Sequence, residues 1–166
     1  MEIRQLHLHD AKAYFALRLE ALKTNPEAFG SSYEEEKDYS ISRTENRLTD
    51  PTSFVFGAFA ENNLVGVLTL MKDTKQKMSH RGHLYAAYVT PLHRGKGVGK
   101  QLVQIAINKA QKLQEIEQLY LEVVSDNIQA KKLYESLGFE TYGMDRKALK
   151  VSGKYYDETL MVLYLY

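Results

Sequence analysis

Three glycines alternate with other residues between Val89 and Lys100, and their position predicts a site for an anion. They lie between an apolar run that predicts a strand and a periodic segment that predicts a helix: Gly95, Gly97 and Gly99. Without a Cβ they allow a ligand close to the backbone, and the unpaired N–H groups of the first helical turn point toward it. These donors and the helix dipole favour a group such as pyrophosphate. Three basic residues add positive charge: Arg94, Lys96 and Lys100.

The glycine spacing fits neither of the two common nucleotide fingerprints. A Rossmann turn has a different spacing and opens the first βα unit, and a P-loop ends in Gly-Lys-Ser/Thr. Two alternatives stay open at this point. The turn can be a loop chosen only for tight packing, or it can belong to a nucleotide-binding module that holds phosphate at the same helix terminus.

A second group of residues follows a predicted buried strand at Gln118 to Val124. Asn127 is a favoured residue for the N-cap of the next helix, and Gly138 stands where a left-handed C-terminal cap is favoured. Tyr134 lies seven residues after Asn127, about two helical turns, so both side chains can occupy one side of that helix. Glu122 alternates with apolar neighbours and is expected on the opposite face of the strand from them.

The two segments together resemble the motifs of the GNAT superfamily of N-acetyltransferases. Arg94, Gly97 and Gly99 match its Arg/Gln-x-x-Gly-x-Gly/Ala motif. The second segment is similar to Asn-x-x-Ala-x-x-Leu-Tyr-x-x-x-Gly-Phe through Asn127, Ala130, Leu133, Tyr134, Gly138 and Phe139. The resemblance implies an α/β fold of GNAT type, with a mixed, mostly antiparallel sheet flanked by helices on both faces. It also implies a single acetyltransferase domain over residues 1–166, with acetyl-CoA as cosubstrate.

The resemblance assigns the cofactor to the first motif and its surroundings. The strand before the turn would hold the pantetheine arm through its backbone, and the turn would hold the pyrophosphate. A backbone N–H near Val89 would polarise the acetyl carbonyl. The cofactor-binding residues implied in this way are Tyr88, Val89, Arg94, Gly95, Lys96, Gly97, Val98, Gly99, Lys100 and Asn127.

Two residues are expected to move protons. In the family, the tyrosine equivalent to Tyr134 often acts as general acid toward the leaving sulfur; the alternative is an aromatic ring packed against the sheet. A lysine-like amine has a pKa of about 10.4 and must lose a proton before it attacks. Glu122 is a candidate base for that proton. Its alternative role is an ion pair or a solvated position. Because the chain has no cysteine, we expect direct transfer in a ternary complex.

The acceptor is expected to be a small-molecule amine or a peptide or protein amine. In the family its pocket is built from the first helices and last strands, where this chain is acidic and aromatic. One hypothesis is that a cationic amine is attracted by Glu34, Glu35, Glu36, Asp157 or Glu158, the alternative being a solvated face. A noncatalytic acyl-CoA sensor remains a second functional class, since it would need neither Tyr134 nor Glu122.

Apolar periodicity predicts the elements that position these residues. A short strand precedes a helix capped near Asp10, and a helical segment or loop follows between Pro26 and Asp50. Further strands are expected at 53–60, 64–71, 83–90 and 118–124, and helices at 98–113 and 127–137. Two final strands, 139–151 and 155–166, are joined at Ser152 and Gly153.

Composition sets the outer limits on function. The chain has 166 residues, 44% of them hydrophobic, which suits one compact domain. Its net charge is +1, so the chain lacks the excess of basic residues that is typical of a nucleic-acid-binding protein. No apolar run is long enough for a membrane span or a secretion signal. We therefore expect a cytoplasmic protein with no nucleic-acid or membrane partner, with a homodimer left open. The five histidines show no metal-ligand spacing, so no catalytic metal is expected.

Overall fold

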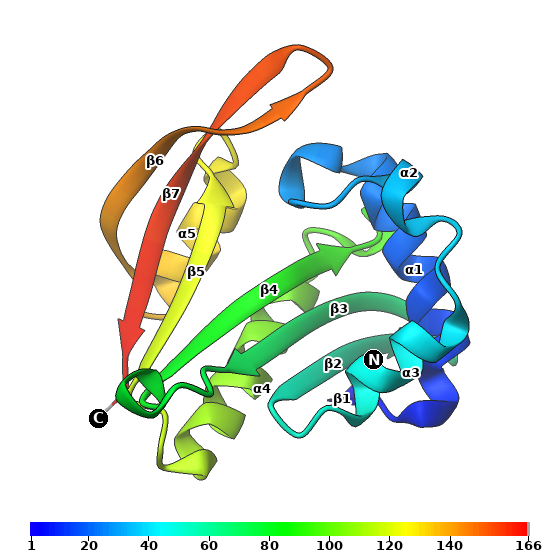
Figure 1. The fold of residues 1–166 in the computed structure, drawn as a ribbon, viewed down its shortest axis with the longest axis horizontal. Helices are drawn as coiled ribbons and strands as arrows, with labels where there is room; N and C mark the ends of the chain where they lie inside the picture. The colour runs from blue at the N-terminus through cyan, green and yellow to red at the C-terminus, as the bar shows by residue number, and fades with distance from the viewer. Residues whose placement is uncertain (166) are drawn as a thin grey trace.

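A mixed seven-stranded sheet forms the centre of the protein (Figure 1). The structure is a computed structural model, and it describes residues 1–165. The strand order is β1-β2-β3-β4-β5-β7-β6, and every neighbouring pair is antiparallel except β4 and β5, which are parallel. The fold class predicted from the sequence is confirmed.

The elements follow one another along the chain in the order that the apolar pattern indicates. The strands are β1 (Glu2–Gln5), β2 (Ser53–Ala60), β3 (Asn63–Lys72), β4 (Arg81–Val89), β5 (Gln118–Val124), β6 (Glu140–Val151) and β7 (Lys154–Tyr164). The α-helices are α1 (Ala11–Thr24), α2 (Tyr33–Glu36), α3 (Ile41–Thr49), α4 (Val98–Leu113) and α5 (Ile128–Ser136). Short 3-10 turns are η1 (Leu8–Asp10), η2 (Pro26–Ala28), η3 (Gln76–Met78) and η4 (Pro91–His93).

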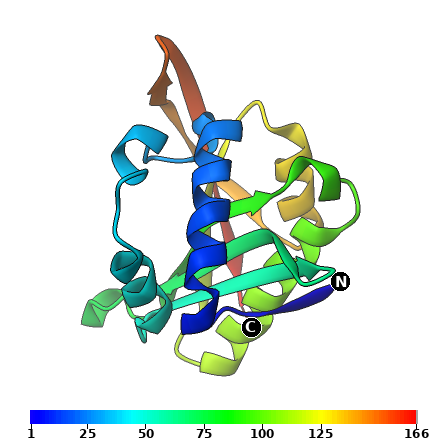
Figure 2. The same cartoon turned by 90° about the vertical axis from the view of Figure 1, so that its right-hand side faces the viewer.

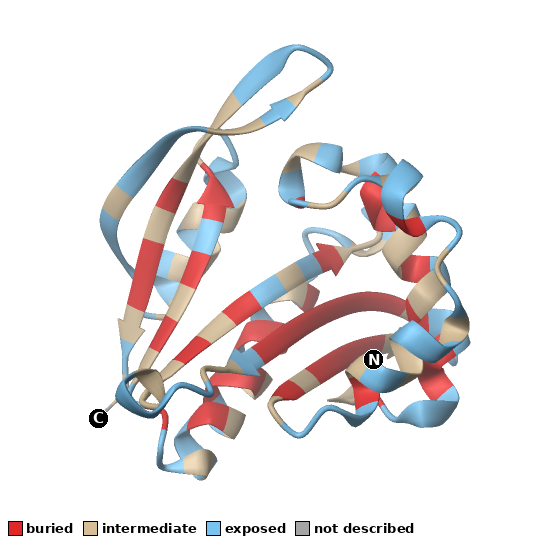
Figure 3. Cartoon of the chain, viewed as in Figure 1, coloured by how far each residue is buried: buried red, intermediate tan, exposed pale blue. Residues whose placement is uncertain are grey.

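Helices cover both faces of the sheet, as Figure 2 shows with α1 on one side and α4 on the other. On the α4 side, Leu102, Val103 and Ala106 pack with apolar residues of β2 to β5, and α5 adds Leu133 and Tyr134. On the opposite side, α1 and α3 cover β2 and β3, with Tyr14 almost fully buried. β2 and β3 are therefore buried along much of their length, whereas β6 is largely exposed (Figure 3).

The parallel strands β4 and β5 pair over a short distance only. Residues 81–83 face residues 118–120 in register, and beyond this point the two strands diverge (Figure 1). In the diverging part, the register between β3 and β4 shifts, and Ala86 has a φ of 54°. This β-bulge adds a residue to β4, so that Tyr85 and Tyr88 both point toward the side of α1. The sheet thus opens at its centre, next to the glycine turn.

Most predicted boundaries agree with the structure to within two residues. The strand predicted at 83–90 begins at Arg81, because Arg81 pairs with β5 and Gly82 pairs with both neighbouring strands. The segment between Pro26 and Asp50 contains η2, α2 and α3 in place of one helix or loop. Asp10 does occupy the N-cap position of α1, but its carboxylate binds Arg4 and the His7 N–H and does not cap the helix. The last strand is described to Tyr164, and Tyr166 lies outside the described residues.

Candidate active site

The glycine turn presents a row of unpaired backbone donors. Gly95 and Gly97 have φ angles of +72° and +78°, a left-handed conformation that glycine adopts at little cost. Gly97 is the N-cap of α4, and the first helical hydrogen bond runs from Gln101 N–H to the Gly97 carbonyl. In the described part of the chain, the N–H groups of residues 95–100 donate to no protein acceptor. Six successive amides at a helix N-terminus form a site suited to an anion.

Glycine is required at Gly95 and at Gly99 for different physical reasons. A Cβ at Gly95 would meet no atom within 4 Å, so only the backbone conformation requires glycine there. Gly99 lies in the first turn of α4, where a Cβ would approach Leu133 Cδ1 to 3.3 Å. Gly99 therefore allows α4 and α5 to approach each other closely. The turn consequently presents a row of backbone donors and also lets two helices pack closely.

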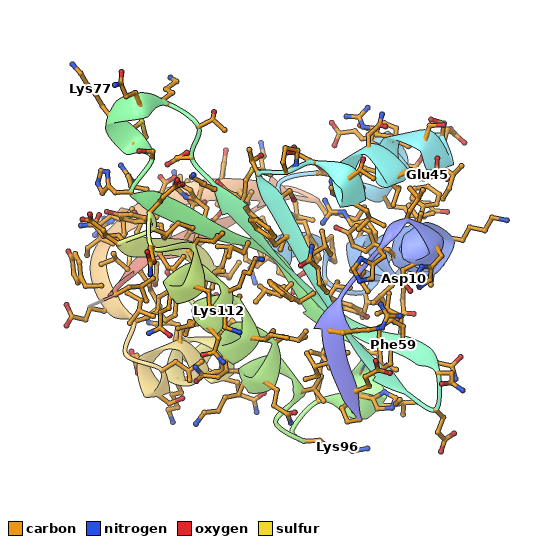
Figure 4. All side chains as sticks on the ribbon, turned by 90° about the horizontal axis from the view of Figure 1, so that it is seen from below. Asp10, Glu45, Phe59, Lys77, Lys96 and Lys112 are labelled. Carbon is orange, nitrogen blue, oxygen red and sulfur yellow. The ribbon has the colours of Figure 1, made fainter. Side chains whose placement is uncertain are left out.

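The basic residues of the turn are placed around the donors. Lys96 and Lys100 are exposed, and Figure 4 shows Lys96 at the end of the turn with its side chain directed away from the protein. Arg94 instead reaches back: its Nε donates to the Val89 carbonyl at 2.8 Å, and a terminal nitrogen donates to Asn25 Oδ1 at 2.6 Å. In this structure Arg94 fastens the turn to β4 and to the end of α1.

An apolar cleft lies where β4 and β5 diverge, between the sheet and the first turns of α4 and α5. It is open to solvent, and the space of about 300 Å³ between its walls includes part of that solvent. Its walls include residues from all four surrounding elements: Val67, Ala87, Tyr88, Val89, Gly99, Leu102, Leu133 and Tyr134. The cleft thus joins the strand end, the glycine turn and Tyr134 in one space. Beyond His83, the edge of β4 that faces this space has no β-strand partner.

Tyr134 contributes a phenol to this cleft. Burial raises its pKa to about 12, so the hydroxyl stays protonated at neutral pH. The ring packs edge-on against Phe139, with 5.8 Å between the ring centroids. Among the described residues, no side chain or carbonyl hydrogen-bonds to this hydroxyl. The arrangement combines the two roles considered from the sequence, since the ring packs while the hydroxyl remains free to donate.

Asn127 and Tyr88 are held by local hydrogen bonds. The Asn127 side chain accepts from Ala130 N–H at 3.1 Å and caps α5, as its residue type predicted. The Tyr88 hydroxyl donates to Glu20 Oε1 at 2.9 Å, which connects β4 to α1. Both side chains therefore fix elements on either side of the cleft, although only Tyr88 lines it.

Glu122 lies in β5 on the face that looks toward α1. Leu121 and Val123 pack in the core on the α4 side, and Glu122, between them in the alternation, is exposed on the other side. The phenols of Tyr85 and Tyr142 lie near this carboxylate. Burial is the main cause that raises the pKa of both phenols, and the negative charge of Glu122 raises them further. Tyr134 and Glu122 are therefore on opposite sides of the sheet, with the divergence of β4 and β5 between them.

The run Glu34 to Glu36 has structural partners within the fold. Glu35 accepts from Ser32 N–H and caps α2, while Glu34 pairs with Lys37. Glu36 is buried, and despite that burial Arg18 lowers its pKa through two hydrogen bonds of 2.9 and 3.0 Å. Each carboxylate of this run thus has a partner in the fold, which for Glu34 and Glu35 lies beside α2 and for Glu36 lies on α1.

Two features of the site were not found from the sequence. The bulge at Ala86 leaves no signal, since alanine is not a residue that prefers a positive φ. The closeness of Tyr85 and Tyr142 to Glu122 depends on strand order, because they belong to β4 and β6. Among residues 1–165, no group of three or more His, Asp or Glu side chains is arranged to hold a metal ion.

The sequence model of the Acetyltransferase (GNAT) family matches residues 16–139, about three quarters of the chain. The chain belongs to the GNAT acetyltransferase family. The match includes the glycine turn, β5, α5 and the cleft between them. The resemblance read from the two motifs is confirmed at the level of the family.

Individual GNAT proteins agree with this membership. The spermidine N(1)-acetyltransferase of Vibrio cholerae is 28% identical over 104 residues, which cover 63% of this chain and 58% of that enzyme. The chain spans about half the length of the curated relatives it matches.

Solved structures extend the similarity of fold to nearly the whole chain. A GNAT acetyltransferase from Streptococcus pneumoniae superposes with a TM-score of 0.88 at 22% identity, covering 99% of both chains. The yncA protein of Salmonella typhimurium, solved with its cofactor acetyl-CoA, superposes with a TM-score of 0.86 at 22% identity, covering 100% of this chain and 94% of that one. At these identities the likeness concerns the GNAT fold.

In the described part of this chain, no helix combines the length and apolar character needed to cross a membrane.

Proposed function

We propose that the protein is an acetyl-CoA-dependent N-acetyltransferase, in which the amine attacks directly in a ternary complex. The observation that carries this proposal is the row of free amides at residues 95–100, which leads into the cleft walled by Val89 and Tyr134. The donor set fits a diphosphate, and the narrow apolar cleft fits an extended arm. Residues 1–166 would form one GNAT domain, and the lack of cysteine agrees with a cytoplasmic location.

The cofactor-binding residues fall into two groups in this proposal. Backbone amides of the turn, Gly95 to Lys100, would hold the diphosphate, with Lys96 and Lys100 adding charge at its rim. Tyr88 and Val89 would bind the pantetheine arm through the unpaired edge of β4, while Asn127 would shape the far wall of the cleft. Arg94 supports the turn from behind by its bond to the Val89 carbonyl.

Two side chains would handle the protons. When bound, acetyl-CoA supplies the thioester whose acetyl group is transferred. Tyr134, protonated at neutral pH, would donate its proton at the sulfur. Glu122, on the opposite side of the sheet, would accept the proton of the amine. A backbone N–H of β4 near Val89 would polarise the carbonyl oxygen.

The acceptor in this proposal is a small-molecule amine or a peptide or protein amine. Vibrio cholerae spermidine N(1)-acetyltransferase and the N-alpha-acetyltransferase RimI of Mycobacterium tuberculosis, among its relatives, carry names of both kinds. A noncatalytic acyl-CoA sensor is the second candidate, because the donor row and cleft alone would suffice for it.

Release of free thiol from acetyl-CoA on addition of a panel of amines tests the proposal. Polyamines, aminoglycosides and peptides with free N-termini form the panel. Thiol release with at least one amine is expected, whereas tight acetyl-CoA binding without release by any amine would favour the sensor. Preferential binding of ATP or NAD in a calorimetric titration would contradict both.

A further inference from the structure

Glu122 has a second carboxylate beside it. In the antiparallel pair of β5 and β7, Glu122 lies opposite Leu160, and Val124 lies opposite Glu158. Glu122 and Glu158 are therefore diagonal neighbours on one face of the sheet, a distance that long side chains can bridge. On the other side of Glu158, Asp145 of β6 stands directly opposite in register.

These carboxylates lack the cationic partner that the buried carboxylates of the protein have. Asp10 is paired with Arg4, and Glu36 with Arg18. Within residues 1–165, none of the ion pairs involves Glu122, Glu158 or Asp145. Two neighbouring carboxylates without a cation repel each other, and a proton held between them removes the repulsion.

The remaining groups on this face do not supply the missing charge. They include Tyr85, Tyr120, Tyr142, Arg81, His83 with its partner Asp73, and Glu27 of η2, which contacts β5 and β6. Arg81 stacks over the Tyr120 ring at 4.1 Å, and Glu27 accepts from the Asn25 amide. Burial first, then a hydrogen bond with Glu122 and its charge, raise the pKa of Glu158 to about 7.

We propose that Glu158 is a positioning residue for the base: it shares a proton with Glu122, and the pair together accepts the proton of the acceptor amine. This inference rests on the proposed N-acetyltransferase function and adds a residue to it. As the amine nitrogen forms its bond to the acetyl carbon, one N–H proton passes to a Glu122 oxygen and comes to rest between the two carboxylates. The C–S bond breaks, its electron pair goes to sulfur, and Tyr134 gives sulfur a proton.

Burial of Glu158 and its pairing with Glu122 make a stronger base than one exposed carboxylate. The pair binds its proton near neutral pH, closer to the pKa of an amine than an ordinary carboxylate does. The fully ionised pair, present above pH 7, would be the active form. The rate should therefore decline as the pH falls through about 7, where the pair takes up its proton.

The pH dependence of kcat/KM with one fixed amine tests the pair. In Glu158→Gln the acidic limb should move from near pH 7 toward about pH 4.5, and the plateau should fall about tenfold. Glu122→Gln should lose most of the activity over the whole range. Glu140→Gln, on exposed β6, is the matched control and should keep the wild-type limb. An acidic limb that stays in place in Glu158→Gln overturns the proposal.

A measurement without turnover separates this inference from the proposed function. In protein labelled with ¹³C at the glutamate side-chain carbons, the Glu158 signal should titrate near pH 7, and Glu122→Gln should lower its pKa toward the ordinary carboxyl range, with the part of the rise that burial causes remaining. Wild-type signals of Glu122 and Glu158 that both titrate below about pH 5.5 would overturn the pair even in an active enzyme. Failure of the wild type to acetylate any amine, with the shared titration present, would refute the proposed function alone.

Discussion

At the scale of single residues, the environment decides what each ionisable side chain can do. Tyr134 and Asp10 are opposite cases. Burial with no partner keeps the phenol of Tyr134 protonated, whereas two hydrogen bonds from Arg4 and one from the His7 N–H keep the carboxyl of Asp10 ionised. The first case leaves a proton available for chemistry, and the second fastens β1 to the start of α1.

Replacing Tyr134 by phenylalanine removes the available proton and keeps the ring packing. We expect kcat to fall by about 10²-fold, the lower range for a general acid, with acetyl-CoA binding changed less than about twofold. Stopped-assay kinetics and calorimetric titration measure the two quantities. Tyr164→Phe, an exposed tyrosine at the end of β7, is the control. Unchanged kcat in Tyr134→Phe would remove the acid from the proposal.

Replacing Asp10 by asparagine should destabilise the fold at neutral pH by about 1–2 kcal/mol. The Arg4 hydrogen bonds, with the His7 N–H, lower the pKa of Asp10 to about 2. A carboxyl whose pKa is lower in the folded state stabilises that state above about pH 3.9, the pKa of the carboxyl in the unfolded chain. This contribution is lost as the pH falls toward 2. Urea unfolding at pH 7 and pH 3 should show the deficit shrinking with acid. Exposed Asp38→Asn should show no such deficit.

At the scale of elements, local sequence pattern predicted what local physics determines. The limits of α4 and β5 agree with the predicted ranges because apolar periodicity and the glycine turn define them. The bulge at Ala86 and the early parting of β4 from β5 depend on how distant segments pack, so no local pattern announces them. The same holds for the pairing of Glu122 with Glu158, since strand register between β5 and β7 sets it.

The glycine turn gives an element-scale prediction. In Gly97→Val, the left-handed φ of +78° becomes strained and the branched side chain stands beside the free amides. Acetyl-CoA binding should weaken at least about tenfold, or about 1.4 kcal/mol, in a calorimetric titration. Gly30→Val, at a site with no atom within 4 Å of the new Cβ and no positive φ, should bind as the wild type does. Equal affinity in the two variants would speak against the turn as the diphosphate site.

At the scale of the whole molecule, the cleft connects the helices α4 and α5 with the centre of the sheet. A ligand bound there contacts α4, α5, β3 and β4 at once. This binding site exists only in the folded state. Its binding should therefore raise the stability of the entire chain.

Thermal unfolding in the presence of ligands measures this coupling. Acetyl-CoA at 100 times its Kd should add about 2.7 kcal/mol, a rise in Tm of roughly 5–10 °C. ATP or NAD at the same concentration should shift Tm by less than about 1 °C, because neither has an arm for the cleft. A nucleotide that stabilises as much as acetyl-CoA does would contradict the assignment of the cleft.

The parting of β4 and β5 has one more consequence. It leaves the amides on the inner margin of β4 beyond His83 without the neighbouring strand that would ordinarily lie there. An elongated ligand that bonds to this margin would take the place of that strand. Deuterium uptake at those amides should then slow on donor binding, while the outer margin of β6 should exchange as before.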